Sequence, residues 1–254
     1  MERGNRELGS SVIHPQDVKL FIATPFFGGA TYNYVQGIFN LGYNLGKFGV
    51  YAHFAQTLNN PYIWTARNRL VADFLKTDFT HFMFIDQDVG FLAEDVFALI
   101  QQDQDIVAGT YPLKQINWEH VEKAVKEGVP ADKLEQHTAM HVFMPVNKQD
   151  KPNSKELLEV INVGTGFMLI KREVFEKLAE TVETYIEVIT PEIRVETLDF
   201  FGHERVNDEF WGEDVSFCMR VRKAGIKIYV APWVQCSHYG SYHYNQKPHH
   251  LKLG

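Results

Sequence analysis

The chain has 254 residues, 45% of them hydrophobic, and is long enough to bury one substantial core. Its 25 basic and 32 acidic residues give a net charge of -7, which excludes a general attraction to polyanions such as nucleic acid. No segment approaches the roughly 20 apolar residues of a membrane span, and residues 1–7 contain no apolar signal-peptide core. We therefore expect a single-domain cytoplasmic protein in which the two cysteines, Cys218 and Cys236, are buried thiols in a helix and a strand.

Strands and helices alternate in the first half of the sequence. Apolar runs predict strands at 18–23, 51–56, 81–85 and 105–109. Apolar residues at helical spacing predict helices at about 33–47, 64–75 and 94–101. This alternation indicates an α/β fold with a mainly parallel sheet that is covered by helices on both faces. Ligands of such sheets bind beyond the carboxyl ends of the strands, so Thr24-Pro25, Asp86-Gln87-Asp88 and Gly109-Thr110-Tyr111 are expected to converge on one site.

The second half of the sequence is less regular. Residues 114–150 are charged, with a surface helix predicted near 121–127, and residues 147–154 resemble an exposed turn. Further elements follow in order: strands at 156–163 and 166–170, a helix at 172–180, a polar strand or loop region up to 205, a helix that ends at Gly225, and a strand at 226–230. The tail, 237–254, is rich in histidine and tyrosine.

Asp86 and Asp88 follow directly on the apolar run His81–Ile85. A buried strand that ends in two carboxylates places both charges outside the core, at the edge of the sheet. Hard oxygen ligands suit Mg²⁺ or Mn²⁺, which take one or two carboxylates together with phosphate oxygens of a substrate. The pair therefore predicts a site for a metal and a diphosphate. The alternative is a polar turn between strand and helix, in which Asp88 or Glu94 lies near a helix start.

A second carboxylate pair, Glu213 and Asp214, stands at the start of a predicted helix. The helix dipole favours acids there, which is a sufficient structural explanation for the pair. The preceding Trp211 and Gly212, however, supply an aromatic wall and a flexible turn against which a sugar ring could lie. His238 follows in a polar segment, and its imidazole could complete the coordination of a cation at Asp88. A lone histidine is more often structural.

This ordered set of motifs resembles the GT-A glycosyltransferases, which have a nucleotide-binding α/β fold and transfer a sugar from a nucleoside diphosphate. The resemblance runs from about Val18 to Tyr239, and its strongest part is the order of Asp-x-Asp, Gly-Glu-Asp and a late histidine. The segments that carry it are Thr24-Pro25, Ala66-Arg67-Asn68-Arg69, Phe84-Ile85-Asp86-Gln87-Asp88, Gly164-Thr165-Gly166-Phe167-Met168-Leu169-Ile170, Trp211-Gly212-Glu213-Asp214 and Ser237-His238-Tyr239-Gly240. The combination also looks like the small glycosyltransferases of large viruses and phages, which would place it in the cytoplasm of a host cell.

The resemblance implies a Rossmann-like mixed sheet in one catalytic domain. Its expected parts are an N-terminal extension (1–16), a nucleotide-binding half (17–113), an acceptor-binding half (114–240) and a C-terminal tail (241–254). It also implies Mn²⁺ or Mg²⁺, held by Asp86, Asp88 and His238, where the cation acts as a Lewis acid on the departing diphosphate.

The donor implied by the resemblance is a UDP- or GDP-sugar. Thr24 and Pro25 would border the nucleobase, and Arg67 would face the nucleotide or its phosphates. Lys114 is a candidate partner of the diphosphate, and a solvated loop lysine is an equally good interpretation of it. The remaining donor-site residues are Asp86 near the ribose, Gly166, where backbone approaches the sugar, and the aromatic wall Trp211.

By the same resemblance, Asp214 removes the proton of the attacking acceptor hydroxyl, and Glu213 holds hydroxyls of donor or acceptor. This assignment makes the enzyme inverting, although a retaining enzyme of similar fold would share Asp-x-Asp. The acceptor is a glycan or another hydroxyl compound, with a modified nucleic-acid base as a less favoured candidate.

Two functions of other classes also fit parts of the sequence. A metal-dependent nucleotidyltransferase or phosphatase would use the same metal carboxylates but would leave the Glu213-Asp214 pair without a role. A non-catalytic carbohydrate-binding protein would use Trp211, Trp233 and the tyrosine-rich tail as stacking surfaces. The tail could also close over the nucleotide as a lid, with His243 or Lys247 touching phosphate, or be a partly ordered terminus.

Overall fold

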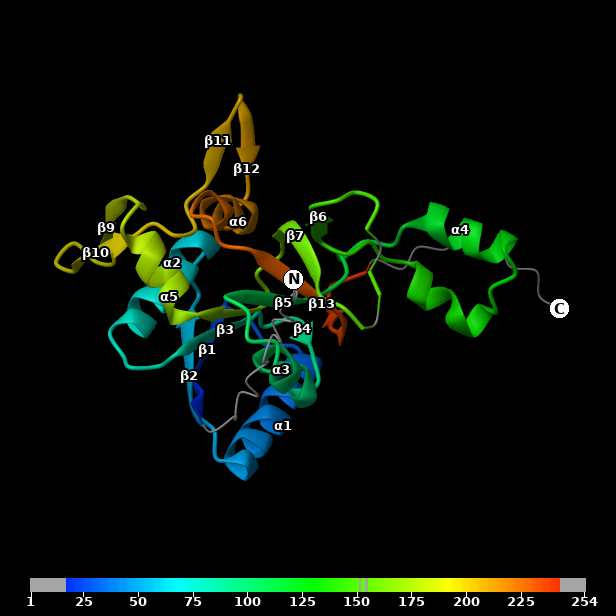
Figure 1. Cartoon of the computed structure of the whole chain (residues 1–254), viewed down its shortest axis with the longest axis horizontal. Coiled ribbons are helices and arrows are strands. Elements are labelled where there is room, and N and C mark those ends of the chain that lie inside the picture. The colour runs from blue at the N-terminus through cyan, green and yellow to red at the C-terminus, as the bar shows by residue number, and fades with distance from the viewer. Residues whose placement is uncertain (1–16, 151, 154, 243–254) are drawn as a thin grey trace, which may run out of the picture.

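The computed structural model describes residues 17–150, 152–153 and 155–242, and within them a central sheet of eight strands is covered by helices on both faces (Figure 1). The strand order is β2-β1-β3-β8-β5-β13-β7-β6. These strands are β1 (Lys19–Phe26), β2 (Tyr51–Leu58), β3 (His81–Ile85), β5 (Ile106–Thr110), β6 (Phe143–Pro145), β7 (Leu158–Val163), β8 (Phe167–Lys171) and β13 (Ile228–Gln235). The α/β class is therefore confirmed. The expected extension 1–16 and the proposed lid residues His243 and Lys247 lie outside the described residues.

The sheet is mixed, and its strand direction changes at β8. β1 is parallel to β2 and β3, and β5 is parallel to β13. β8 lies between β3 and β5 and is antiparallel to both, and β7 is antiparallel to β13 and β6. The sheet thus contains three parallel and four antiparallel pairings, more antiparallel ones than the alternating first half of the sequence predicts. Strands from both halves of the chain share this sheet.

Two layers of helices enclose the sheet (Figure 1). α1 (Tyr32–Phe48) and α3 (Ala93–Ile100) pack on one face, and α2 (Ile63–Leu75), α5 (Arg172–Ala179) and α6 (Glu213–Lys223) pack on the other. The core between the sheet and helices α2, α5 and α6 contains phenylalanines that are almost completely buried, namely Phe74, Phe82, Phe175 and Phe217. These aromatic side chains supply much of the apolar surface that the fold buries.

Helix α1 begins and ends where its sequence predicts. The side chain of Thr31 accepts a hydrogen bond from the backbone N–H of Tyr34, which satisfies one of the free donors at the helix start. Gly49 ends the helix with a φ of 68°, a left-handed conformation that glycine adopts without steric cost. Because β1 ends at Phe26 and α1 begins at Tyr32, the start of this helix lies just beyond the carboxyl end of β1, next to the predicted site.

Several elements lie outside the central sheet. α4 (Trp118–Lys126) and a 3₁₀ helix (Ala131–His137) form an arm at one side of the molecule (Figure 1). The polar region up to 205 contains the hairpin of β9 (Thr184–Val188) and β10 (Arg194–Leu198). A second hairpin, β11 (Glu204–Val206) and β12 (Glu209–Trp211), was not predicted. Its two-residue turn consists of Asn207 and Asp208, both with positive φ, as such hairpins require.

Both cysteines are buried free thiols, as expected. Cys218 lies in α6, but Cys236 lies between β13 and the short strand β14 (Ser237–His238) rather than inside a strand. Among the helices of the described segments, none is long and apolar enough to cross a lipid bilayer.

Candidate active site

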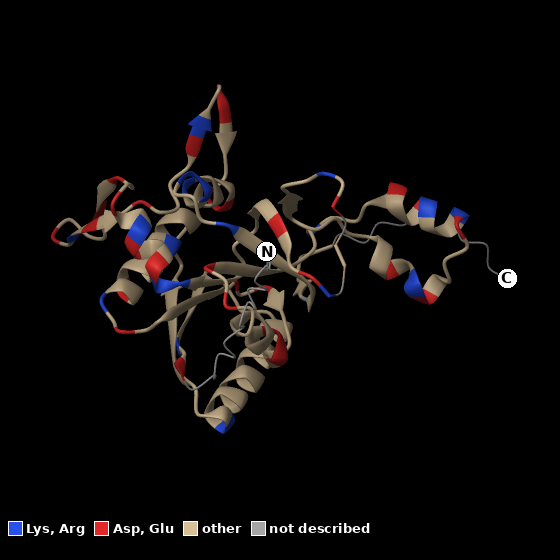
Figure 2. Ribbon diagram, viewed as in Figure 1, with Lys and Arg blue, Asp and Glu red and all other residues tan. Residues whose placement is uncertain are grey.

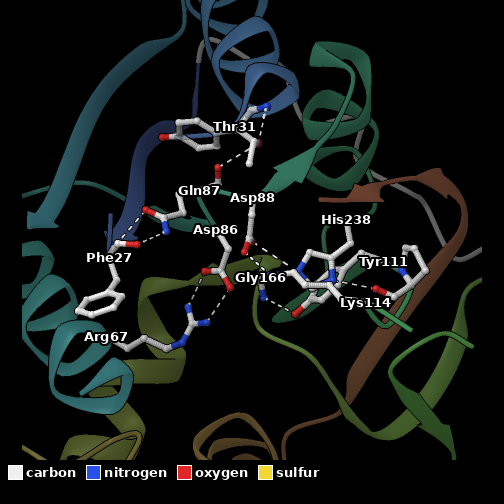
Figure 3. Close-up of polar contacts among 12 residues, drawn as sticks. Phe27, Thr31, Arg67, Asp86, Gln87, Asp88, Tyr111, Lys114, Gly166 and His238 are labelled. Carbon is white, nitrogen blue, oxygen red and sulfur yellow. Dashed lines mark hydrogen bonds and ion pairs between the residues drawn. The ribbon is translucent and has the colours of Figure 1, made fainter. Parts of the chain in front are cut away.

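The segment Asp86-Gln87-Asp88 follows β3 and leads into the short strand β4 (Val89–Gly90), as Figure 3 shows. β4 pairs antiparallel with β14, so that His238 lies opposite Val89. The backbone N–H of Tyr239 also donates to the carbonyl of Asp88 at 2.9 Å. This pairing brings the late histidine to the aspartate motif, although the two are far apart in the sequence.

Arg67 connects the two acidic motifs of the site. It lies in α2 with 3% of its side chain exposed, and its two terminal nitrogens donate to the two carboxylate oxygens of Asp86 at 3.0 and 2.9 Å. Its Nε lies 3.8 Å from Oε1 of Glu213, in the first turn of α6. Burial alone would lower the pKa of Arg67, but the charges of Asp86 and Glu213 outweigh it and raise that pKa, so the guanidinium stays charged.

His238 and Asp88 form the second polar centre. Nδ1 of His238 lies 2.8 Å from the carbonyl oxygen of Pro112, and because a carbonyl can only accept, that nitrogen carries the ring proton. Nε2 then points at Oδ1 of Asp88 from 3.4 Å. Two acceptors that face each other in this way require a proton or a metal cation between them.

Lys114 contacts the other carboxylate oxygen of Asp88. Burial acts to raise the pKa of Asp88, but hydrogen bonds with His238 and Lys114 outweigh burial and lower that pKa to about 2. Asp88 is therefore ionised at neutral pH, and the site holds positive charge on one side of it. Ammonium and imidazole groups placed in this way suit a diphosphate as well as a carboxylate.

Gln87, the middle residue of the motif, fixes the loop between β1 and α1. Its side-chain amide donates to the carbonyl of Phe27 at 2.7 Å and accepts from the N–H of Phe27 at 3.0 Å. Its backbone carbonyl accepts from the N–H of Thr31 at 3.1 Å. The sequence indicates no role for Gln87 beyond its position between the two aspartates of the motif.

Gly166 provides a close backbone approach at the floor of the site. Its carbonyl accepts from the N–H of Asp86 at 2.9 Å, and its own N–H donates to the hydroxyl of Tyr111 at 2.9 Å. A Cβ at this position would lie 2.8 Å from both Oδ2 of Asp86 and the Tyr111 hydroxyl. A side chain here would displace Asp86 or Tyr111. Tyr111 was expected at this edge of the sheet, but its contact with Gly166 was not predicted.

Tyr111 contacts His238 and also Gly166, which packs against Asp86, and so touches both polar centres of the site. Burial, followed by the charge of Asp86, raises the pKa of Tyr111 far above its ordinary value, so its hydroxyl stays protonated. Its ring meets the imidazole of His238 edge to face, with centroids 4.9 Å apart. Tyr111 therefore limits the orientation of His238 while its hydroxyl holds Gly166.

Glu213 and Asp214 occupy the first turn of α6, and Gly212 is the N-cap residue of this helix. Burial, together with the neighbouring charge of Glu213, raises the pKa of Asp214, and a backbone hydrogen bond to Val215 only partly offsets this. Trp211 ends β12 directly before this turn and is partly buried. Its backbone carbonyl accepts from the hydroxyl of Ser216 at 3.1 Å, which ties the hairpin to the helix.

A cavity of about 360 Å³ lies between the end of β1, the start of α1 and β2. Thr24, Tyr34 and Phe54 are among its lining residues. The hydroxyl of Thr24 is buried and lies 2.8 Å from that of Tyr34. Pro25 is also buried, but it does not line this cavity. The cavity is mainly apolar with a few polar groups, which is typical of sites that bind small molecules.

Among the described residues, no three histidine, cysteine, aspartate or glutamate side chains are grouped as a complete metal site. Of the three expected ligands, Asp88 and His238 face each other, whereas both oxygens of Asp86 accept from Arg67. Two protein ligands nevertheless fit Mg²⁺ or Mn²⁺, since these ions commonly take the rest of their ligands from water and phosphate. The hydrogen bond from Nδ1 of His238 to a backbone carbonyl is the usual support of a metal-binding imidazole.

No protein-family model and no curated protein sequence matches the chain. Among solved structures, A197 from STIV is similar with 18% identity and a TM-score of 0.48 over 88% of this chain and 86% of that one. GalNAc-T7, crystallised with UDP, GalNAc and Mn²⁺, is similar with 11% identity and a TM-score of 0.46 over 87% of this chain and 44% of that one. A Drosophila beta-1,4-galactosyltransferase 7 variant in complex with manganese, UDP-Gal and xylobiose shows 13% identity and a TM-score of 0.42 over 84% and 65%. The chain therefore spans less than two thirds of these two glycosyltransferase chains.

Proposed function

We propose that this protein is a metal-dependent glycosyltransferase that transfers a sugar from a nucleoside-diphosphate sugar to an acceptor hydroxyl. One observation carries the proposal: a single buried guanidinium, that of Arg67, contacts Asp86 and approaches Glu213. The segment that suits a metal diphosphate and the segment that suits a general base therefore border one space, as transfer of a sugar between two substrates requires.

The donor would lie with its diphosphate beside Asp88, His238 and Lys114. Asp88 and His238 would hold Mn²⁺ or Mg²⁺, which supplies Lewis-acid stabilisation of the diphosphate leaving group when it is bound. Lys114 contacts Asp88 in the structure, so it would also lie near the oxygens of the diphosphate and would neutralise part of their charge. Asp86 would act mainly through its ion pair with Arg67, which keeps the motif in place.

The nucleobase would occupy the cavity at the end of β1. Thr24 and Tyr34 supply hydroxyls there, and Phe54 and Phe26 supply apolar surface. The cavity lies near the aspartate motif, because Thr31, which caps the helix that carries Tyr34, donates from its N–H to the carbonyl of Gln87 at 3.1 Å. A UDP- or GDP-sugar could thus extend from this cavity towards Asp86 and Asp88, over the close contact that Gly166 makes with Asp86 and Tyr111.

Asp214 is the proposed general base. The acceptor oxygen would attack the anomeric carbon while its proton moves to the carboxylate of Asp214, and the bond between the anomeric carbon and the diphosphate oxygen would break. A raised pKa makes the carboxylate of Asp214 a stronger base. Glu213 and Trp211 would hold the hydroxyls and one face of the sugar. Direct attack of this kind inverts the configuration of the anomeric carbon.

A screen of UDP- and GDP-sugars with Mn²⁺, measuring release of nucleoside diphosphate by hydrolysis, tests the proposal without knowledge of the acceptor. We expect Asp88→Ala to abolish release, whereas Asp214→Asn should keep release and impair transfer once an acceptor is known. His120→Ala, on the surface helix α4, is the control and should behave as the parent.

The same screen distinguishes the rival functions. Release of pyrophosphate or inorganic phosphate in place of nucleoside diphosphate would identify a nucleotidyltransferase or phosphatase. Glycan binding that needs neither Mn²⁺ nor Asp88, without hydrolysis of any donor, would identify a carbohydrate-binding protein and refute the proposal.

A further inference from the structure

Four aromatic rings from separate elements form a continuous row beside the proposed catalytic acids. Tyr185 of β9 lies 5.3 Å from Trp64 of α2, measured between ring centroids, and Trp64 lies 6.3 Å from His203. His203 stacks on Phe210 of β12 at 4.8 Å with an angle of 20° between the rings. We name Tyr185, Trp64, His203 and Phe210 the aromatic platform. None of the four has a role in the donor site described above.

The hairpin register explains why His203 and Phe210 stack. Glu204 pairs with Trp211 and Arg205 with Phe210, so His203 continues β11 to a position opposite Gly212. Phe210 is two residues before that position on the facing strand, and residues related in this way point to the same side of a hairpin. The pair therefore presents two stacked rings on one face of the β11–β12 hairpin, which projects from the molecule near α6 (Figure 1).

The platform adjoins the catalytic acids at two points. His203 lies opposite Gly212, the N-cap residue of α6, and Glu213 and Asp214 follow directly. Trp64 precedes Arg67 by one helical turn, and residues at this spacing lie on the same side of a helix. Arg67 in turn approaches Glu213. The row of rings thus extends from β9 to the hairpin strand that directly precedes the pair.

These rings are not needed to attach the hairpin. Polar contacts already do so: the N–H of Glu204 donates to Ser216 at 2.9 Å, and Arg220 forms an ion pair with Glu204 at 2.9 Å. Phe210 is 66% exposed, so its ring contributes little to the core. An exposed aromatic ring stacked on a second one is a typical surface for the apolar face of a ligand ring.

The charge around the platform selects among ligands. Residues 203–214 contain five acidic side chains and one basic side chain, Arg205, and acidic positions occur on both strands of the β11–β12 hairpin (Figure 2). Carboxylates accept hydrogen bonds from hydroxyls but repel phosphates and other anions. A neutral sugar, with C–H groups on one face and hydroxyls at its rim, fits this combination, whereas a nucleic acid or a phosphorylated acceptor does not.

We infer that the aromatic platform is the acceptor-binding site and that it binds a neutral glycan by stacking a pyranose ring on His203 and Phe210. This inference rests on the proposed glycosyltransferase function, because only that function requires an acceptor beside Asp214. It adds the chemical class of the acceptor and residues that determine it.

The test uses saturation-transfer NMR with irradiation of upfield methyl protons of the protein and four neutral probes: cellotriose, maltotriose, xylotriose and triacetylchitotriose. Trigalacturonic acid and oligothymidylate serve as anionic probes. We expect at least one neutral trisaccharide to bind and both anions to give no signal. Phe210→Ala and His203→Ala should each weaken the Kd of that trisaccharide about tenfold, as loss of a central aromatic contact does. Tyr43→Ala, which removes a 73% exposed ring of α1 on the opposite face of the sheet, is the matched control and should leave the Kd unchanged.

Thermal melting of each variant shows that it is folded before binding is measured. Binding of an anionic probe alone, absence of binding by all neutral probes at millimolar concentration, or an unchanged Kd in both platform variants would overturn the inference. Donor hydrolysis by the parent protein separates it from the proposed function. Hydrolysis without trisaccharide binding refutes the platform alone, and trisaccharide binding without hydrolysis of any donor refutes the glycosyltransferase proposal.

Discussion

The imidazole of His238 points its Nε2 at Oδ1 of Asp88 from 3.4 Å, while its Nδ1 is held by the carbonyl of Pro112 at 2.8 Å. The orientation of the ring is fixed by backbone and by the edge of Tyr111, not by Asp88. His238 is therefore held with one nitrogen directed into the site before any ligand arrives, and metal-binding histidines commonly have such support.

The first prediction concerns this pair. Asp88→Asn and His238→Ala should each weaken binding of Mn²⁺ in the presence of UDP by at least about 10-fold to 100-fold, the range for loss of an outer-shell partner, because each removes one of the two proposed protein ligands. Electron paramagnetic resonance of free Mn²⁺ measures this directly and requires no turnover. His120→Ala is the control for loss of a surface imidazole. Unchanged Mn²⁺ affinity in both site variants would show that the cation, if bound, lies elsewhere.

The second prediction concerns the ion pair of Arg67 with Asp86. Arg67→Met should destabilise the fold by on the order of 3 kcal/mol, because it leaves the carboxylate of Asp86 without its partner in a largely buried position. The double variant Arg67→Met with Asp86→Asn should lose less than the sum of the two single variants. Urea unfolding measures all three free energies.

The matched control for this cycle is Lys126→Met. Lys126 and Glu122 form an i,i+4 pair on α4 with side chains 70% and 65% exposed, and such pairs contribute less than about 1 kcal/mol. If the Arg67 and Asp86 variants are additive, or if Arg67→Met costs no more than Lys126→Met, the pair does not fix the site as we describe.

Much of the fold follows from local patterns. The period of apolar residues identifies α1, because burial on one face of a helix repeats with the helical period. The apolar run His81–Ile85 identifies β3, because a strand buried on both faces is apolar throughout. Local patterns do not predict that β8 lies between β3 and β5, since the pairing of strands distant in sequence depends on the whole sheet. The hairpin at Glu204–Trp211 was missed because its strands are short, charged and mostly exposed.

The site was predictable to the extent that it lies at strand ends. Asp86 and Asp88 were expected beyond β3, and the expectation that His238 meets Asp88 agrees with the observed contact. The pairing of Arg67 with Asp86 was not foreseen, because a helix sequence shows which face is apolar but not which acid a buried arginine will meet. Tyr111 was expected at the same edge of the sheet, but its contact with Gly166 was not foreseen for a similar reason: its buried hydroxyl accepts from the backbone N–H of Gly166.

The third prediction concerns the pH dependence of transfer. Burial and the charge of Glu213 raise the pKa of Asp214 above its ordinary value of 3.8, and a general base must be deprotonated to act. The midpoint of the acid limb of kcat/KM should therefore lie above pH 3.8, and activity should be lost as the pH falls through that midpoint. Glu213→Gln removes a nearby negative charge, which lowers the pKa of Asp214 and should move this limb to lower pH.

The control for this shift is Glu119→Gln on α4, which should leave the acid limb in place. Asp214→Asn should reduce transfer by about 10²-fold to 10⁴-fold at all pH values, the range typical of loss of a general base. A limb that stays in place or moves to higher pH in Glu213→Gln would exclude Asp214 as the group that titrates.

The fourth prediction concerns Gly166. In Gly166→Ala the new methyl group would lie 2.8 Å from both Oδ2 of Asp86 and the hydroxyl of Tyr111. Neither neighbour can move freely, because Arg67 holds Asp86 with two hydrogen bonds and the N–H of Gly166 itself holds Tyr111. We expect a lower melting temperature and at least about tenfold weaker binding of UDP with Mn²⁺, measured by calorimetry, since overpacking of this kind costs about 1–3 kcal/mol.

Gly42→Ala is the matched control for the glycine substitution. Gly42 lies inside α1, and a Cβ there would meet nothing within 4 Å. This change should stabilise the protein by about 0.5–1 kcal/mol, because alanine loses less conformational freedom than glycine when a helix forms. The two substitutions add the same methyl group and should shift the melting temperature in opposite directions. If Gly166→Ala melts at or above the parent temperature and binds UDP normally, the close contact of Gly166 with Asp86 and Tyr111 does not constrain the site.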